Sequence, residues 1–507
     1  MDAAFVPLLL LSSVGYASGA LAATNVRVVL EDLVIGDETY KRYAMKGDGP
    51  QWFEQDGTAG IKVRFGDDSF KVVYHNLLDV PTVIHQHGLT PSHNLDGVPY
   101  MSTPPIQPSR SSLVEFPLTY ENTGTYFLHS HYGFQHELGV GAPVIVEAPM
   151  PLGYPLRSRI RRAKDVVMML EDFGGYFADN ETTNLDGFSP NEVYQELVDA
   201  WGDDSGEWDY EECMAPGDGM DVHFRYHLCN SKTLLDPVVV KHRPGDDLRI
   251  RVISGTTMSN YKLEFPVNVT LIAVDGQPVK PKRMDTFWIA VAQRADFLMT
   301  IPRTKNKKVF PIFARVASDK KQRSGLVITT GSKANVPEYS LTTDDAVGDM
   351  GDGVGTKQEM TLEAWKPLSP RRDVHWFHLN ITGDNGFNAI NRVSYQLPPT
   401  VPTYTPNPNP LVVKYGERVC IQLRNFNADA HPFHMHGKSF QVVEIDGQEF
   451  NGAMRDVVLT PKGDCKTVSF CFDATNPGVW PLHCHMAYHL YAGMLTTIEY
   501  EGVALSS

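Results

Sequence analysis

The residues best suited to carry chemistry lie near the C-terminus of this 507-residue chain. Cys484 sits between His483 and His485, His489 follows the cysteine by five residues and Met494 by ten. In an extended strand successive side chains leave on opposite faces, so His483 and His485 share one face and Cys484 takes the other. A blue-copper centre usually binds its metal through one thiolate and two imidazoles, with a weak axial thioether. The stretch therefore predicts a blue-copper centre that still lacks one histidine.

The missing histidine is expected in the segment His431-Pro-Phe-His434-Met-His436. His434 and His436 are two residues apart and share a face of an extended segment, whereas His431 should face the other way. We therefore assign His431 to the Cys484 centre, together with His489. The pair that remains resembles two earlier His-x-His pairs, which are His85 with His87 and His129 with His131.

An internal repeat relates the first and last parts of the chain. Residues 124–131 match residues 478–485 position for position, which indicates two copies of one β-barrel unit. The first copy lacks the blue-copper ligands, with Thr82 in place of His431, Ser130 in place of Cys484 and Ala142 in place of Met494. If the two barrels face each other, their eight paired imidazoles converge at one interface. Such a cluster could hold three coppers.

These four segments resemble the copper signatures of the multicopper oxidases, specifically the three-domain laccase type, over roughly residues 25–503. The resemblance implies four coppers per chain: one type 1, one type 2 and a type 3 pair. Carried over residue by residue, it implies type 2 ligands at His85 and His434, type 3 ligands at His87, His129 and His485 and at His131, His436 and His483, and type 1 ligands at His431, Cys484 and His489 with Met494 axial.

The activity implied by the resemblance is oxidation of phenols or aromatic amines, one electron at a time, at the type 1 copper. An exposed edge of a type 1 histidine is expected to receive the electrons. Cys484 is joined through the backbone to His483 and His485, which gives electrons a short covalent path to the three-copper cluster, where O₂ is reduced to water. Asp96 matches the acid that the family places near the type 2 copper, so we expect it to supply protons; the alternative is a turn-forming Asp-Gly.

Two departures from the family pattern bear on the substrate. Relatives often carry a second acid in or beside the HCHxxxH segment, and this chain has none among Met486, Ala487, Tyr488 and Leu490. Arg225 stands where fungal laccases have an acid that receives a phenolic proton, although Glu212 or Asp221 could replace it. An Fe(II) or Cu(I) oxidase and a copper-binding or storage protein therefore remain as alternatives.

The composition predicts an all-β fold. The chain is far longer than one core usually holds, and its many short alternating runs are interrupted by Gly and Pro. We expect a signal peptide at residues 1–23, and the resemblance implies three cupredoxin-like Greek-key β-barrel domains. The first covers 24–155 with type 2 and type 3 ligands, the second 160–335 without copper ligands, and the third 361–507 with type 1, type 2 and type 3 ligands, after a linker at 336–360.

The N-terminus predicts export, and three sequons could carry glycans if the source is eukaryotic. An apolar run at 5–11 is followed by small residues, as in a secretory signal peptide, although no Lys or Arg precedes the run. We therefore expect a secreted protein, extracellular or, in a bacterium, periplasmic, without a membrane span. Asn180, Asn268 and Asn380 are candidate glycosylation sites.

The cysteine count bears on the disulfides, and the net charge bears on the binding partners. Apart from Cys484 there are five cysteines, so at least one stays free. We expect a disulfide between Cys213 and Cys229, and a second from Cys420 to either Cys465 or Cys471, which lie too far apart on one strand to bridge each other. The net charge of −15 argues against nucleic acid as a partner. We expect a monomer that takes small-molecule donors and O₂.

Overall fold

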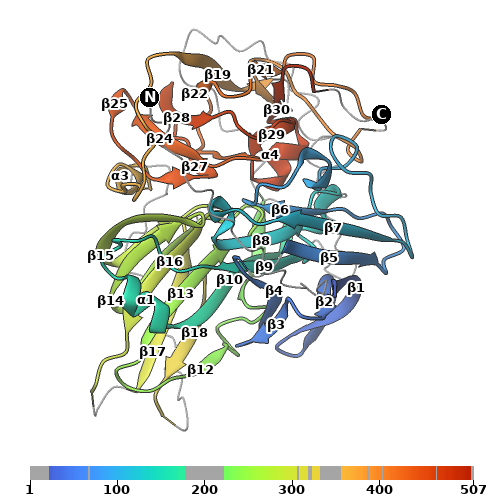
Figure 1. The fold of residues 1–507 in the computed structure, drawn as a ribbon. Helices are drawn as coiled ribbons and strands as arrows, with labels where there is room; N and C mark the ends of the chain where they lie inside the picture. The colour runs from blue at the N-terminus through green and yellow to red at the C-terminus, as the bar shows by residue number, and fades with distance from the viewer. Residues whose placement is uncertain are drawn as a thin grey trace, which may run out of the picture.

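The computed structural model describes residues 22–66, 69–176, 222–304, 308–317, 322–331, 355–384, 387–401, 403–463 and 465–503. Strands dominate these residues, and the helices are few and short, which confirms the all-β prediction (Figure 1). The sheets draw on three successive parts of the chain, here called the N-terminal, middle and C-terminal parts. The predicted domain boundaries stay a prediction.

The N-terminal part forms two sheets that enclose a common core. Their strand orders are β2-β1-β5-β7 and β3-β4-β9-β8-β6. Alternate residues of β1 and β5, such as Val26, Val28 and Val72, are fully buried, as expected for strands with one face on a core. The strands are β1 (Thr24–Ile35), β2 (Glu38–Asp48), β3 (Trp52–Gln55), β4 (Thr58–Arg64), β5 (Ser69–Asn76), β6 (Ile84–His87), β7 (Ser111–Pro117), β8 (Gly124–Ser130) and β9 (Gly141–Glu147).

The middle part is one nine-stranded sheet, preceded by the short helix α1 (Arg157–Arg162). The strand order is β11-β10-β13-β16-β14-β17-β18-β12, with β15 paired to β14. Its inner face carries an apolar core of its own. The strands are β10 (Lys164–Tyr176), β11 (His223–Cys229), β12 (Val239–Lys241), β13 (Asp247–Ser254), β14 (Tyr261–Val274), β15 (Gln277–Ile289), β16 (Arg294–Thr300), β17 (Val309–Val316) and β18 (Arg323–Thr329).

The C-terminal part again has two sheets, ordered β20-β19-β22-β28-β24-β25, with β26 paired to β24, and β21-β30-β29-β23-β27. The elements are α3 (Gly355–Glu359), β19 (Val374–Asp384), β20 (Phe387–Ile390), β21 (Leu411–Val413), β22 (Arg418–Asn425), β23 (Pro432–Met435), β24 (Phe440–Ile445), β25 (Gln448–Glu449), β26 (Met454–Arg455), β27 (Val457–Leu459), β28 (Lys466–Asp473), β29 (Val479–Cys484), α4 (Ala487–Tyr491) and β30 (Leu495–Tyr500). The sheets of this part lie above the other two parts in Figure 1, with β6 and β8 next to α4 and β29.

The end of the predicted linker is structured. Residues 355–359 form α3, and Glu359 is buried, where its carboxylate pairs with Arg455 at 2.7 Å. Residues 336–354 lie outside the described residues, as do Asn180 and nearly all of the predicted signal peptide. The sequon residues Asn268 and Asn380 are exposed. No helix within the described ranges has the length and apolar character needed to cross a membrane.

The structure decides the pairing of Cys420. It bonds Cys471 on the neighbouring strand, with their Cα atoms 4.1 Å apart. Cys465 also belongs to a disulfide. The prediction of a disulfide from Cys213 to Cys229 is wrong, because Cys229 is free and fully buried at the end of β11. There it packs in the core of the middle part as a small apolar residue.

Removing the disulfide tests this pairing. Replacing Cys420 and Cys471 together with alanine should lower the free energy of unfolding by about 2–4 kcal/mol, because the unfolded chain regains the entropy of a long loop. The Cys229→Ala variant is the control, since it removes a thiol of equal size without opening a loop. Chemical denaturation of both variants measures the difference. An equal loss in the two variants would contradict the assignment.

Candidate metal centres

The predicted blue-copper ligands form one compact group. The Cys484 sulfur lies 3.8 Å from Nδ1 of His431 and 3.6 Å from Nδ1 of His489, and the two Nδ1 atoms are 3.1 Å apart. All three side chains are buried. Met494 is also buried, and its backbone bonds both Cys484 and His489. One thiolate and two imidazoles that face a common point are the ligand set of a blue-copper centre.

Local structure explains how these ligands meet. Cys484 is the last residue of β29 and lies opposite Phe433, the second residue of β23. His431 belongs to the loop that directly precedes β23. The chain then turns into the single-turn helix α4, which brings His489 back over the end of the strand. The backbone N–H of His431 donates to the Thr460 hydroxyl at 2.8 Å, which fixes the loop. Three separate segments therefore present their donors to one point.

The paired histidines form a second, larger group where the N-terminal and C-terminal parts meet. The His87 ring stacks on the His434 ring with centroids 3.8 Å apart, and the His85 ring stacks on the His436 ring at 4.0 Å. Strand register supplies the rest, because β6 places His85 opposite His129 and β23 places His434 opposite His483. The eight imidazoles of this histidine cluster are His85, His87, His129, His131, His434, His436, His483 and His485.

The donor atoms of the histidine cluster fall into overlapping groups. One group contains His87, His129 and His485, as the resemblance implies for one type 3 copper. The other two groups are His85 with His87 and His434, and His85 with His131 and His436. His483 completes the cluster, with its Nε2 atom 3.0 Å from Nε2 of His436. The structure thus brings together all the histidines predicted as ligands, while the division among individual coppers remains a proposal.

The protonation state of these histidines suits metal binding. Burial, followed by the neighbouring imidazoles, lowers the pKa of His87, His129, His131, His434, His483 and His485 well below the usual value. Burial and His85 lower the pKa of His436 to about 4, against the opposing effect of Asp96. Neutral imidazole is the form that binds a metal. The Nε2 atoms of His85, His131 and His434 are buried and have no hydrogen-bond partner among the described residues, as expected of atoms that ligate a metal.

Asp96 contacts one histidine from each side of the interface. It is fully buried, its Oδ2 atom accepts a hydrogen bond from Nδ1 of His436 at 2.8 Å, and its backbone carbonyl accepts one from Nδ1 of His85 at 2.6 Å. Burial alone would raise the pKa of the Asp96 carboxyl, but His436 and His85 outweigh this effect and lower it. The contacts turn Nε2 of both rings toward the cluster. Asp96 therefore does more than form a turn.

Two carboxylates beside the ligands had no signal in the sequence. Glu137 is buried and accepts a hydrogen bond from the Tyr488 hydroxyl at 3.2 Å, so an acid does reach the HCHxxxH segment, but from the N-terminal part. Burial and the nearby Asp172 raise the pKa of Glu137 well above its usual value. Asp456 contacts His87 and His434. Only tertiary contacts identify these two residues.

The first copy of the repeat retains the outline of a blue-copper site without its ligands. The Gln135 amide oxygen accepts hydrogen bonds from Thr82 at 2.7 Å and from Ser130 at 2.9 Å. Gln135 follows Ser130 by five residues, as His489 follows Cys484. All three residues are buried. A hydrogen-bonded polar trio thus fills the position that the metal ligands occupy in the second copy.

The expectation of an exposed type 1 histidine edge is wrong. His431 and His489 are both fully buried. The amide of Asn427 contacts Nε2 of His431 at 3.3 Å, and Asn427 is itself buried. Arg225 is exposed on β11, and the acids considered as its replacement, Glu212 and Asp221, lie outside the described residues.

Comparison with known proteins identifies the family. Profiles described as multicopper oxidase match residues 58–151, 213–335 and 376–502. The chain belongs to the multicopper oxidase family. Members bind four coppers of types 1, 2 and 3, and the histidine clusters described above fit these sites. Copper is therefore the cofactor.

Relatives with different names match most of the chain. The chain is 28% identical over 452 residues to the multicopper oxidase MmcO of Mycobacterium tuberculosis, covering 87% of this chain and 81% of MmcO. It is 25% identical to the iron transport multicopper oxidase fio1 of Schizosaccharomyces pombe, covering 86% of this chain and 70% of fio1. A copper resistance protein A homolog of Pseudomonas syringae pv. tomato is 26% identical, with 88% of each chain covered.

Solved structures confirm the cupredoxin-like fold. The structure of Fet3p, a multicopper oxidase that functions in iron import, superposes with a TM-score of 0.72 at 19% identity, covering 94% of this chain and 90% of Fet3p. The laccase from Botrytis aclada gives a TM-score of 0.69 at 19% identity, covering 95% of this chain and 88% of the laccase. At these identities the likeness concerns the fold alone.

The Cys484→Ser variant tests the blue-copper assignment. A hydroxyl cannot replace the soft thiolate, so the blue charge-transfer absorption and donor oxidation should both disappear while the fold survives. Visible absorption, circular dichroism and copper analysis measure the three effects. The matched control is Ser130→Cys, which should add no second blue centre, because Thr82 and Gln135 offer no imidazole. A blue Cys484→Ser protein would overturn the assignment.

The Asp96→Asn variant tests the carboxylate beside His436. Asparagine keeps the shape but removes the charge and the titratable group, so reoxidation by O₂ should slow by roughly 10–100-fold. Reduction of the blue centre by a donor should stay close to the parent rate, since the histidines that Asp96 contacts are His85 and His436, which belong to the histidine cluster and not to the blue-copper group. Stopped-flow absorption separates the two half-reactions. Parent-like reoxidation would leave Asp96 with a purely structural role.

Proposed function

We propose that this multicopper oxidase is laccase-like and couples the oxidation of phenols or aromatic amines to the reduction of O₂ to water. The observation that supports the coupling is the position of Cys484. Its side chain belongs to the blue-copper group, and its two chain neighbours, His483 and His485, belong to the histidine cluster. Bound copper supplies the one-electron oxidation of the donor and the four-electron reduction of O₂.

The protein contributes geometry, a covalent path and exclusion of water. The backbone on either side of Cys484 joins the two groups without a gap in covalent structure. The side chains of both groups are at most 6% exposed, so water is kept from the electron path. We propose that Asp96, which accepts a hydrogen bond from His436, delivers protons to the cluster.

The surroundings of His431 support an organic donor. The hydrogen-bond partner of its Nε2 atom is Asn427, a neutral amide that offers a metal cation no charge. An apolar cluster containing Trp288, Ala290 and Leu459 packs against the partly exposed Ala430, next to His431 in the chain. Because His431 and His489 are buried, electrons from the donor cross this covering layer. A neutral, electron-rich aromatic donor suits electron transfer across such an apolar layer, because it needs no charged ligand.

Oxidation of Fe(II) or Cu(I) is the second candidate function. Relatives named as iron transport oxidases and copper resistance proteins support it. An Fe(II) or Cu(I) donor needs carboxylates or methionines close to the type 1 ligands. Among the described residues, Asp429 is a partly exposed acid two positions before His431. Copper storage finds less support, because the family consists of oxidoreductases.

We also propose that the protein is exported. The Cys420–Cys471 disulfide is typical of an oxidising compartment. The apolar run at 5–11 supports the same view. N-terminal sequencing of the mature protein tests the proposal: a mature chain that begins near residue 24 is expected, and one that retains residue 1 would refute export by cleavage.

Steady-state kinetics on one preparation distinguishes the two donor classes. We expect a higher kcat/KM for a dimethoxyphenol than for Fe(II), and poor oxidation of phenols without electron-donating substituents. Asp429→Asn should leave oxidation of the dimethoxyphenol intact, because an organic donor needs no cation ligand. If Fe(II) is the better substrate and loses this advantage in Asp429→Asn, the protein is a metal-ion oxidase.

A further inference from the structure

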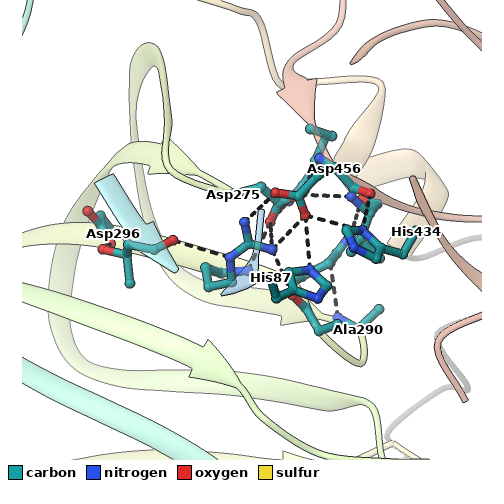
Figure 2. Close-up of polar contacts among 12 residues, drawn as sticks. His87, Asp275, Ala290, Asp296, His434 and Asp456 are labelled. Carbon is teal, nitrogen blue, oxygen red and sulfur yellow. Dashed lines mark hydrogen bonds and ion pairs between the residues drawn. The ribbon is translucent and has the colours of Figure 1, made fainter. Parts of the chain in front are cut away.

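A buried ion network lies behind two histidines of the cluster, one from each side of the interface (Figure 2). Its centre is Asp456, between β26 and β27, which is 1% exposed. The Asp456 carboxylate lies 3.3 Å from Nε2 of His87, and its backbone carbonyl accepts a hydrogen bond from Nδ1 of His434 at 2.8 Å. One residue thus contacts a ligand of the N-terminal part and a ligand of the C-terminal part.

Arg294 holds Asp456 in place. It begins β16 of the middle part, which contains no predicted copper ligand, and it is fully buried. Its Nη1 atom donates to Asp456 Oδ1 at 2.6 Å, and Nη2 pairs with Oδ2. The same guanidinium donates to the carbonyl of Ala292 at 2.9 Å and, from Nε, to that of Thr125 at 3.2 Å. A planar fork of this kind fixes a carboxylate in one orientation.

A second carboxylate of the middle part fixes the same segment. Asp275 accepts a hydrogen bond from the backbone N–H of Arg294 at 2.9 Å and others from the N–H groups of Asp456 and Val457 at 3.3 Å. Figure 2 shows Asp275 and Asp456 next to each other within one connected set of contacts that includes His87 and His434. The backbone and the side chain of Asp456 are therefore both anchored to the middle part.

The Arg294–Asp456 pair packs tightly against the chain that carries His87. A Cβ atom added to Gly88 would lie 2.5 Å from Nη2 of Arg294 and 2.6 Å from Oδ2 of Asp456. Gly88 has a φ of +83°, which disfavours other residues as well. The Tyr126 ring covers the guanidinium with its centroid 5.6 Å away. Little room remains for the arginine or the carboxylate to adopt another position.

The contacts also determine which nitrogen of each ring faces the cluster. Asp456 contacts Nε2 of His87, so the Nδ1 atom of that ring faces the cluster. It lies 3.3 Å from Nε2 of His129. In His434 the arrangement is reversed, because its Nδ1 atom bonds the Asp456 carbonyl and its Nε2 atom has no partner among the described residues. Partners of the non-ligating nitrogen set the tautomer and the orientation of a metal-binding histidine.

We propose that Arg294 is a positioning residue for the type 2 and type 3 coppers, acting through Asp456 on His87 and His434. The middle part, which contains no predicted ligand, thereby controls the geometry of the histidine cluster. The inference rests on the proposed ligand roles of these two histidines. It assigns no influence on the Cys484 centre, because none of the contacts of Arg294 described above reaches His431, Cys484 or His489.

The Arg294→Lys variant is the direct test, because lysine keeps the charge and loses the fork. Copper retention against a chelator should weaken by about 10–100-fold at the type 2 and type 3 sites, as is usual when a partner of a metal ligand is lost. The blue absorption should be unchanged. Copper analysis, electron paramagnetic resonance of the type 2 signal and visible absorption measure the three sites separately.

The matched control is Arg251→Lys. Arg251 is also buried between the N-terminal and middle parts, where it pairs with Asp165 at 2.9 Å and donates to the Thr125 hydroxyl at 2.9 Å. Among the described residues, the side chain of Arg251 contacts Asp165, Thr125 and Asp296 and no histidine of the cluster. The control should lose thermal stability and keep all the copper signals. Equal copper loss in the two variants, or parent-like retention in Arg294→Lys, would overturn the proposal.

A second variant tests the proposal if Arg294→Lys does not fold. Arg294→Met combined with Asp456→Asn removes both charges, so no unpaired ion stays buried. Selective loss of type 2 and type 3 copper is again expected, and full retention would refute the positioning role.

Measurements on the parent protein distinguish a failure of this inference from a failure of the proposed ligand roles. A parent without a type 2 signal refutes those roles, whereas a normal parent with a normal variant refutes only the role of Arg294.

Discussion

Eight imidazole rings meet in a buried interface, and each ring has two nitrogens that burial deprives of water. A buried polar atom without a partner costs free energy, so the protein must provide for every nitrogen that no metal binds. Asp96 does so for His85 and His436, and Asp456 does so for His87 and His434. Nδ1 of His129 contacts the carbonyl of Ser130, and Nδ1 of His483 contacts that of Cys484. The Nε2 atoms of His85, His131 and His434 have no hydrogen-bond partner among the described residues. The cluster is therefore more stable with metal bound than without it.

Strand register makes this interface possible. In a His-x-His pair both rings leave the same face of the strand, and the residue between them enters the core on the other face. In β29 that intervening residue is Cys484, so one strand serves the histidine cluster with one face and the blue-copper group with the other. In β8 the intervening residue is Ser130, whose hydroxyl donates a hydrogen bond to Gln135. That side of the strand therefore carries hydrogen-bonded polar side chains in place of metal ligands. The two copies therefore share the same strand geometry and differ in the residue between the two histidines.

The sequence predicted what depends on local spacing and failed where tertiary contacts decide. The histidine pairs and the group around Cys484 follow from strand alternation, and the structure brings those residues together. Arg294 and Asp456 carry no local signal, because their roles arise from contacts among three separate parts of the chain. The pairing of Cys213 with Cys229 was inferred from nearness in sequence, whereas Cys229 faces a core. The burial of His489 likewise depends on segments distant from it in sequence.

Copper analysis of the purified protein, combined with visible absorption and electron paramagnetic resonance, tests the central claim most directly. The claim is that Cys484 joins a blue-copper group to a three-copper histidine cluster in one chain. It predicts four coppers per chain, with an intense blue absorption and a separate type 2 signal. About one copper per chain with a blue colour would show that the histidine cluster does not assemble, and a colourless protein would contradict the account as a whole.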